Sequence, residues 1–324
     1  GNVDLSVGST LCLSAALSAK LLSVGINPFI AILVSLAVTC IIGIWQGWLI
    51  GYIHIPPFIC TLAGMFLFRG IARVILDSKT VAVMDKKFLS LFTSYIQIPG
   101  LDVNQRVISS MAVGILVAIT ITAYTFISER NKMKKGYESA SIKATAIKVA
   151  IFDLVILFYA YKLMSYKGIP IMLIWILVVV AIFAFITSST VFGRYFYAVG
   201  GNEKATRLSG IDPRKVYFWA YFLMSLLAGL SGLLVGARIG SVDGNMGNSY
   251  EMDAIASCFI GGASAYGGLG TVQGIMIGAI LLGVINQGMS ILGLPDQFQY
   301  IVKGAVLLGA VVFDVVSNHK TGKS

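Results

Sequence analysis

The chain has little charge and few metal-binding side chains for its length. Of 324 residues, 12% are charged, two are histidines, and the four cysteines form no CxxC pair. A soluble domain is about a quarter charged, and zinc sites and disulfide frameworks need clustered Cys or His. The composition therefore argues against a soluble fold, and we predict neither a metal centre nor a disulfide scaffold.

The sequence also lacks the motifs of common enzymes, since it contains no HExxH, no GxSxG and no paired intramembrane aspartates. The last four residues, Thr321 to Ser324, resemble the end of a P-loop. A P-loop needs a glycine five residues before its Gly-Lys pair, and that position is Ser317. We predict no catalytic residues and no ATPase site in this chain.

Apolar residues are abundant instead. They form 57% of the sequence, and the mean hydropathy is +0.87. A bilayer is the solvent that suits this composition, and a spanning helix needs roughly 20 apolar residues. We predict an all-α, polytopic integral membrane protein with about ten segments, some of them broken or re-entrant. The segments are Val7–Leu22, Phe29–Tyr52, Pro57–Leu76, Val107–Ile127, Val149–Met164, Ile169–Phe192, Val216–Ala237, Ala254–Tyr266, Thr271–Leu292 and Tyr300–Val316.

The net charge of +10 indicates membrane orientation, not nucleic-acid binding, because the cations lie in short loops between apolar segments. Loop 128–148 holds six cations and two carboxylates, and loop 193–215 holds five and two. Loop 238–253 holds one cation and three carboxylates. The positive-inside rule places the first two loops and the C-terminal tail in the cytoplasm, and the third loop outside. Loop 77–106 also falls outside, although it carries four cations.

Charged residues are rare inside the predicted segments. We interpret Asp153 as a boundary charge paired with Lys148, and we expect the charged side chains near segment ends to reach the lipid–water interface. These are Lys20, Lys162, Lys303 and Asp314. Ion-coupled transporters usually place carboxylates at mid-membrane, so a secondary transporter is the less favoured alternative.

Glycines recur every four residues in three segments, a spacing that lets helix backbones approach closely in lipid. The three sets are Gly43, Gly47 and Gly51; Gly232, Gly236 and Gly240; and Gly274 and Gly278. We predict that they are packing surfaces, with a moving helix interface as the alternative.

The loop 193–215 contains a short helix with recognisable ends. Asn202 suits an N-cap, and Glu203 would lie in the first turn. Gly210 can end the helix in a left-handed conformation, and Pro213 stops further helix. A capped helix over Glu203–Leu208 would suit a lever for a soluble partner, although an ordinary polar connector fits the same residues.

Four stretches of sequence carry a family resemblance. They are YAVGGNEKATRLSGI (197–211), GNVDLSVGS (1–9), CFIGGASAYGGLGTVQG (258–274) and IPPFICTLAGMFLFRGIA (55–72). Together they resemble membrane (permease) subunits of ATP-binding-cassette (ABC) sugar importers of the ribose, xylose and galactose type, closest to the xylose and multiple-monosaccharide permeases. The resemblance covers essentially the whole chain.

The resemblance implies one transmembrane permease domain over 1–324, truncated at its N-terminus, in the inner membrane of a prokaryote. It implies a second permease subunit in a homodimer, an ATPase subunit that binds ATP and Mg, and an extracytoplasmic sugar-binding protein. The chain itself would hold no cofactor. The residues that match the ATPase-coupling stretch are Asn202, Glu203, Lys204, Ala205, Thr206, Arg207, Ser209, Gly210 and Ile211.

Polar residues in and beside the segments are candidates for the translocation path. Glycine-interrupted segments in corresponding halves point to such a path, and amides suit a neutral sugar, while interhelical hydrogen bonds or tight turns are the structural alternative. The candidates are Asp4, Ser6, Gln46, Ser264, Tyr266, Asn286 and Gln287. The sequence does not name the sugar; an autoinducer-2-like compound, a nucleoside or a branched-chain amino acid are the alternative substrates.

Overall fold

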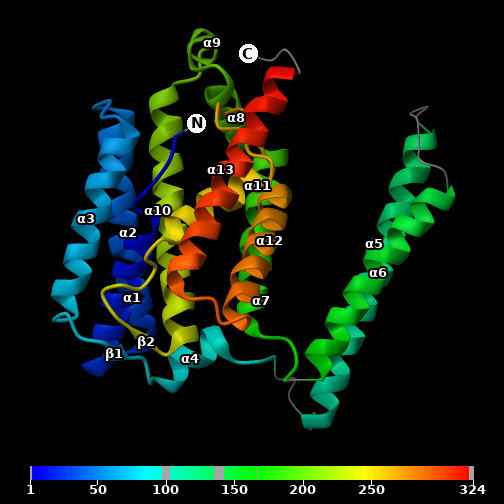
Figure 1. The fold of residues 1–324 in the computed structure, drawn as a ribbon, viewed down its shortest axis with the longest axis horizontal. Coiled ribbons are helices and arrows are strands. Elements are labelled where there is room, and N and C mark those ends of the chain that lie inside the picture. Colours follow the sequence, from blue (N-terminus) through cyan, green and yellow to red (C-terminus); the bar gives the residue numbers. More distant parts are fainter. Residues whose placement is uncertain (1, 97–102, 135–141, 166, 321–324) are drawn as a thin grey trace. The chain divides into compact units, whose positions relative to one another are not determined.

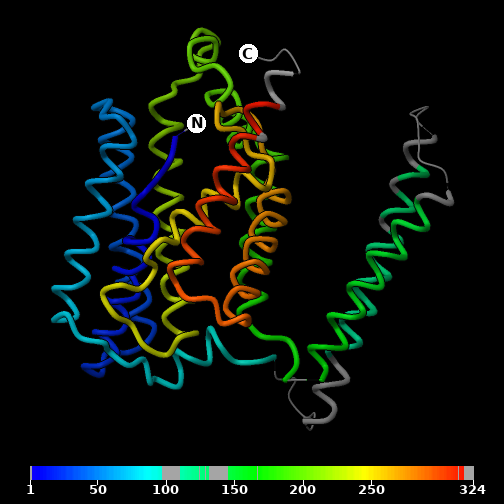
Figure 2. Tube along the Cα trace, viewed as in Figure 1, coloured from blue at the N-terminus to red at the C-terminus, as the bar shows by residue number. Residues whose placement is uncertain are grey.

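The computed structural model describes residues 2–96, 103–134, 142–165 and 167–320 (Figures 1 and 2). Within these residues the regular structure is helical apart from two strands of two residues each. The fold is therefore all-α, as predicted. The helices are α1 (Val7–Ser23), α2 (Pro28–Gly51), α3 (Pro57–Ile75), α4 (Lys86–Thr93), α5 (Val103–Lys134), α6 (Ile142–Met164), α7 (Ile171–Ser189), α8 (Val191–Gly201), α9 (Glu203–Leu208), α10 (Pro213–Ile239), α11 (Tyr250–Ile260), α12 (Val272–Ile291) and α13 (Asp296–Lys320). The P-loop-like tail, residues 321–324, lies outside the described residues.

The chain divides into two compact units, Gly1–Phe92 with Ile176–Ser324, and Thr93–Trp175. The smaller unit contains α5 and α6, which pack along each other. The Thr122 hydroxyl on α5 donates to the Asp153 carboxylate on α6 at 2.7 Å. Asp153 was predicted to pair with Lys148, but in the structure its partner is the Thr122 hydroxyl of the neighbouring helix.

Seven helices of the described part are long and apolar enough to cross a membrane. They are α2, α3, α7, α10, α12, the stretch Ser110–Ile127 of α5 and the stretch Asp296–Val316 of α13. The protein is therefore a multi-pass membrane protein. The predicted segment count of ten is approximate, because α1 and α11 are short and α6 carries Lys148, Asp153 and Lys162.

Two of the predicted segments form short helices. The first apolar helix, α1, has 17 residues, and α11 has 11. At a rise of 1.5 Å per residue α11 is about 16 Å long, roughly half the hydrocarbon thickness. Gly261 and Gly262 end α11, and Gly262 has a φ of +84°. The prediction that some segments are broken is confirmed for this glycine-rich stretch.

The position of α11 differs from the predicted segment Ala254–Tyr266. The helix begins at Tyr250 and ends at Ile260, because carboxylates in its first turn favour a helix N-terminus and glycines follow its last residue. Glu251 and Asp253, which the sequence assigned to a loop, consequently lie on a helix. Glu251 is 7% exposed.

The core of the larger unit is formed by α1, α2, α3 and α10. A Cβ atom added at Gly47 of α2 would lie 2.7 Å from the Phe218 carbonyl oxygen of α10, and one at Gly43 would lie 2.8 Å from the Phe222 Cα. The predicted packing role of these glycines is confirmed. Gly240 was also predicted to be part of a packing surface, but it instead caps the C-terminal end of α10 with a φ of +75°.

The two ends of the larger unit carry different features (Figure 1). At one end, β1 (Val81–Ala82) pairs antiparallel with β2 (Ser241–Val242), so the loops after α3 and α10 share a side. Lys20 at the end of α1 forms an ion pair with Asp77 at 2.8 Å. The helix α9 lies at the opposite end of the unit.

Candidate coupling and translocation site

The local structure of α9 follows its capping residues. The Asn202 side chain accepts a hydrogen bond from the Ala205 backbone N–H at 2.9 Å, and Gly210 has a φ of +85°. Pro213 occupies the first turn of the next helix, α10, which Asp212 caps by accepting from the Arg214 N–H at 3.1 Å. The predicted start and end of this short helix are confirmed.

The segment before α9 is more helical than the sequence indicated. The predicted segment Ile169–Phe192 is split into α7 and α8 at Thr190, whose hydroxyl accepts from the Gly193 N–H at 3.0 Å. The first part of the predicted loop 193–215 is thus helix α8. Only residues near 202 and 209–212 connect the helices on either side of α9.

The residues of α9 are exposed, with one exception. Thr206 is buried, and its hydroxyl donates to the Asn202 carbonyl at 2.7 Å. Leu208, which the sequence reasoning omitted, is 90% exposed. The other predicted coupling residues of this segment are exposed apart from Ile211, which is half-buried: Asn202, Glu203, Lys204, Ala205, Arg207, Ser209 and Gly210.

A polar groove of about 380 Å³ runs beside α9. Its lining residues are His54, Glu203, Arg207, Gly210, Ile211, Asp212, Pro213 and Arg214. Four of the predicted coupling residues, Glu203, Arg207, Gly210 and Ile211, therefore share this groove with residues that sequence reasoning did not select.

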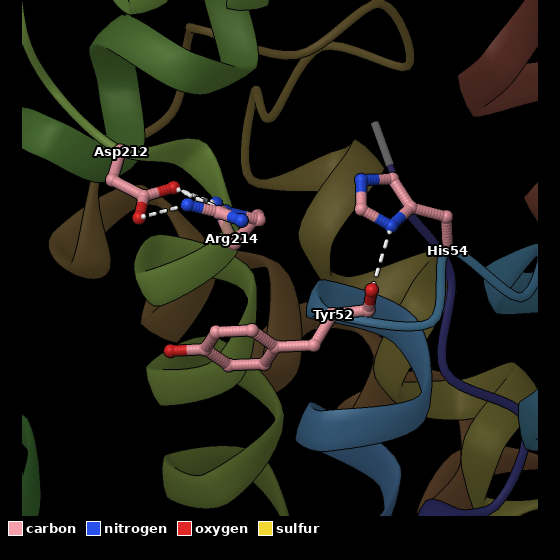
Figure 3. A network of polar contacts seen from close by, with 4 residues as sticks. All are labelled: Tyr52, His54, Asp212 and Arg214. Carbon is pink, nitrogen blue, oxygen red and sulfur yellow. Dashed lines mark hydrogen bonds and ion pairs between the residues drawn. The ribbon is translucent and has the colours of Figure 1, made fainter.

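Arg214 is held in place at the edge of this groove (Figure 3). Its guanidinium donates to both Asp212 carboxylate oxygens, at 3.0 and 3.1 Å, and these bonds lower the pKa of the Asp212 carboxyl. The guanidinium also lies over the Tyr52 ring at 5.9 Å from its centre. Tyr52 and His54 come from the turn after α2, and no local pattern links that turn with the segment near 212.

A second cavity, of about 510 Å³, lies between three parts of the chain: the residues before α1, the residues around α8 and the start of α10, and the glycine-rich loop after α11. Asp4 reaches it from the N-terminal stretch, and Gly267, Gly268 and Leu269 reach it from the stretch after α11. Glu203 lines this cavity as well as the groove. The Tyr217 hydroxyl of α10 donates to Glu203 at 2.7 Å. The structure thus brings the N-terminal stretch and the glycine-rich loop after α11 together beside α9.

The glycine-rich loop after α11 is fixed to its surroundings by three contacts. The Tyr197 hydroxyl of α8 donates to the Gly270 carbonyl at 2.9 Å. Asp314 of α13 accepts from the Ala265 N–H at 3.0 Å. The Asp314 carboxylate therefore binds this loop, whereas we predicted that it would reach the lipid–water interface. A Cβ atom at Gly200 would lie 2.8 Å from the Gly268 nitrogen.

The predicted path residues fall into three groups. Asp4 lines the second cavity, with its Oδ1 accepting from the Ser6 hydroxyl at 2.7 Å. Gln46 is fully buried and donates to the same hydroxyl at 3.0 Å, so Ser6 and Gln46 position Asp4. Ser264 and Tyr266 lie in the glycine-rich loop, where the Tyr266 N–H donates to the Ser264 hydroxyl at 3.2 Å. Asn286 and Gln287 line a different cavity, between α11, α12 and α13.

Comparison with known proteins identifies the class to which this fold and site belong. The chain belongs to the family described as the permease component of the branched-chain amino acid transport system, which matches residues 1–311. The structure is accordingly that of a transport permease subunit. No solved structure matches the chain.

The relatives within that family have more specific names. The chain is 34% identical over 320 residues to the xylose transport system permease protein XylH of Haemophilus influenzae, covering 98% of this chain and 83% of that protein. It is 32% identical over 320 residues to XylH of Escherichia coli K12, covering 98% and 79%. It is 33% identical over 313 residues to the ribose import permease protein RbsC of E. coli K12, covering 96% and 77%. The resemblance to sugar permeases is confirmed.

Proposed function

We propose that this chain is the membrane-spanning subunit of an ABC importer that carries a monosaccharide across the inner membrane of a prokaryote. The names of the bacterial relatives, xylose and ribose permeases, support the substrate class. The partners are an ATPase subunit that binds ATP and Mg, an extracytoplasmic sugar-binding protein and a second permease subunit. The chain contributes the path and has no ATPase site of its own.

The observation that carries the proposal is the exposed, capped helix α9. A leucine that is 90% exposed beside a polar groove suits a docking contact, because apolar anchors rimmed by polar groups typify interfaces. Glu203 connects this surface with the inner cavity through Tyr217. A movement of the docked ATPase would therefore be transmitted to the cavity through the Glu203 side chain.

A branched-chain amino acid is the second candidate substrate, because the family description names it. The two substrates differ in charge as well as shape, since an amino acid carries an ammonium and a carboxylate and a monosaccharide carries neither. The assembled importer in proteoliposomes distinguishes them. We expect ATP-dependent uptake of labelled D-xylose or D-ribose and no uptake of L-leucine; uptake of L-leucine alone would contradict the sugar assignment.

The docking role of α9 is tested by Leu208→Asp. A carboxylate on this exposed side chain leaves the fold intact but places a charge in the ATPase interface, so we expect uptake and stimulated ATPase activity to fall at least tenfold together. The matched control is Leu292→Asp, because Leu292 is 77% exposed and caps the end of α12, and the turn from α12 to α13 lies at the end of the unit opposite α9. Equal losses in both variants would remove the docking assignment.

A further inference from the structure

A polar cavity of about 520 Å³ lies between α11, α12, α13 and the end of α10. Its lining residues include Arg238, Tyr250, Asp253, Asn286, Gln287 and Lys303. The turn between α12 and α13 lies at the end of the larger unit opposite α9 (Figure 1). This cavity is therefore separate from both cavities beside α9.

An ion pair forms one wall of the cavity. Lys303 Nζ lies 2.8 Å from Asp253 Oδ2, and each side chain is 22% exposed. The Asn286 amide donates to the same carboxylate oxygen at 3.3 Å. These contacts correct the expectation that Lys303 reaches the lipid–water interface, because its ammonium is paired within the bundle.

The Asn286 amide oxygen is buried and has no hydrogen-bond partner in the described structure. A buried acceptor without a donor costs about 1–3 kcal/mol, so this atom is suited to a donor that arrives from outside the chain. Gln287, the next residue, lines the same cavity and is exposed. Two adjacent amides thus offer donors and acceptors to the cavity.

The depth of these groups argues against a role at the lipid surface. Lys303 lies about 10 Å along α13 from its first residue, Asp296, at 1.5 Å per residue. Ionisable residues at membrane depth face the bundle interior or a water-filled cavity and mark substrate pathways. The volume also lies within the roughly 300–1,000 Å³ of ligand sites.

The chemistry of the lining suits an uncharged polyhydroxylated ligand. The charges of Asp253 and Lys303 neutralise each other, so a small ion would have to break their contact. The other cation of the lining, the exposed Arg238, can donate to ligand hydroxyls. A sugar hydroxyl can donate to the Asn286 amide oxygen and accept from Gln287, leaving that contact intact. Tyr250 adds an aromatic ring to the lining, which suits the C–H face of a sugar.

We infer that this cavity binds the transported monosaccharide, with Asn286 and Gln287 as its hydroxyl contacts and the Asp253–Lys303 pair as the group that positions Asn286. The inference rests on the proposed sugar-import function. It adds to that function a substrate site at the end of the bundle remote from the coupling helix.

The test compares Gln287→Leu with Gln273→Leu in the full importer in proteoliposomes. Both glutamines are exposed residues of α12, but Gln273 lies at the other end of the helix and does not line this cavity. Asn286→Leu is the second variant. Labelled D-xylose and D-ribose uptake and ATP hydrolysis stimulated by the loaded binding protein are measured on the same vesicles.

We expect Gln287→Leu and Asn286→Leu to lower sugar transported per ATP hydrolysed at least tenfold, while stimulated hydrolysis stays within twofold of the unaltered importer. Gln273→Leu should leave both quantities unchanged. Unchanged sugar per ATP in Gln287→Leu would overturn the inference and leave the sugar-import function standing. Absence of uptake of both sugars by the unaltered importer would instead remove the proposed function. Because Gln287 is exposed, its replacement keeps the test valid even if Asn286→Leu fails to fold.

Discussion

Single residues decide how closely the helices of the larger unit approach. Gly47 faces the backbone of α10, where an added Cβ would lie 2.7 Å from the Phe218 carbonyl oxygen. We predict that Gly47→Ala destabilises the protein by about 1–3 kcal/mol, the usual cost of overpacking. The measurement is thermal unfolding in detergent. Gly70→Ala is the control, because a Cβ at Gly70 of α3 meets nothing within 4 Å; an equal loss in the control would show that contact with α10 is not the cause.

The residue scale also shows what the sequence could and could not predict. The spacing of Gly43 and Gly47 predicted a packing surface, since a four-residue repeat places small residues on one face of a helix. The ion pair of Asp253 with Lys303 was not predictable. These residues lie on different helices, and their contact depends on how α11 and α13 pack.

At the scale of elements, α9 depends on its two ends. We predict that Asn202→Ala removes the hydrogen bond to the Ala205 N–H and destabilises α9 by about 0.5–2 kcal/mol. Amide hydrogen exchange over residues 203–208 should become faster, with a parallel decrease in uptake. Asn202→Asp retains a capping oxygen and should keep slow exchange. Unchanged exchange in Asn202→Ala would show that packing of Thr206, not the cap, maintains the helix.

The other end of α9 gives a stronger prediction. Gly210 has a φ of +85°, whereas proline fixes φ near −65°, so Gly210→Pro cannot keep the chain path into α10. We expect Gly210→Pro to abolish uptake while membrane abundance stays near that of the unaltered chain. Arg207→Glu, which reverses a charge in the groove, should also stop uptake. Normal uptake by both variants would contradict the coupling assignment.

Elements differ in how far local sequence determines them. The short helix α9 was predicted with its caps because Asn202, Gly210 and Pro213 each act on neighbouring residues. The helix α11 was misplaced, because apolar content alone extended it through glycines that in fact form a loop held by Tyr197 and Asp314. The cavity beside α9 required stretches from both halves of the sequence, which no local signal brings together.

At the scale of the whole molecule, the predicted orientation places α9 in the cytoplasm and the paired loops of β1 and β2 outside. Cysteine labelling tests this orientation, and it requires a variant in which the four native cysteines are replaced: Cys12, Cys40, Cys60 and Cys258. In that background, we expect a membrane-impermeant thiol reagent to label Lys79→Cys in intact cells and Lys204→Cys only in inverted vesicles. Both positions are exposed. Labelling of Lys204→Cys in intact cells would reverse the orientation and remove the proposed ATPase contact.

The molecule as a whole also depends on a partner for energy under the proposed function. We predict that the purified chain hydrolyses no ATP above background until the ATPase subunit is added. The readout is phosphate release at saturating MgATP. Hydrolysis that persists after every partner has been removed would show that the chain has an ATPase site of its own.

The close approach of Gly200 and Gly268 has a mechanical consequence for a transporter. Where side chains separate two moving segments, they can change rotamer, so a small displacement of one segment need not move the other. Here the two backbones meet with no side chain between them, because a Cβ at Gly200 would lie 2.8 Å from the Gly268 nitrogen. Under the proposed function, a shift of α8 caused by the ATPase subunit would therefore be transmitted to the glycine-rich loop, and to the cavity that this loop lines, with little loss.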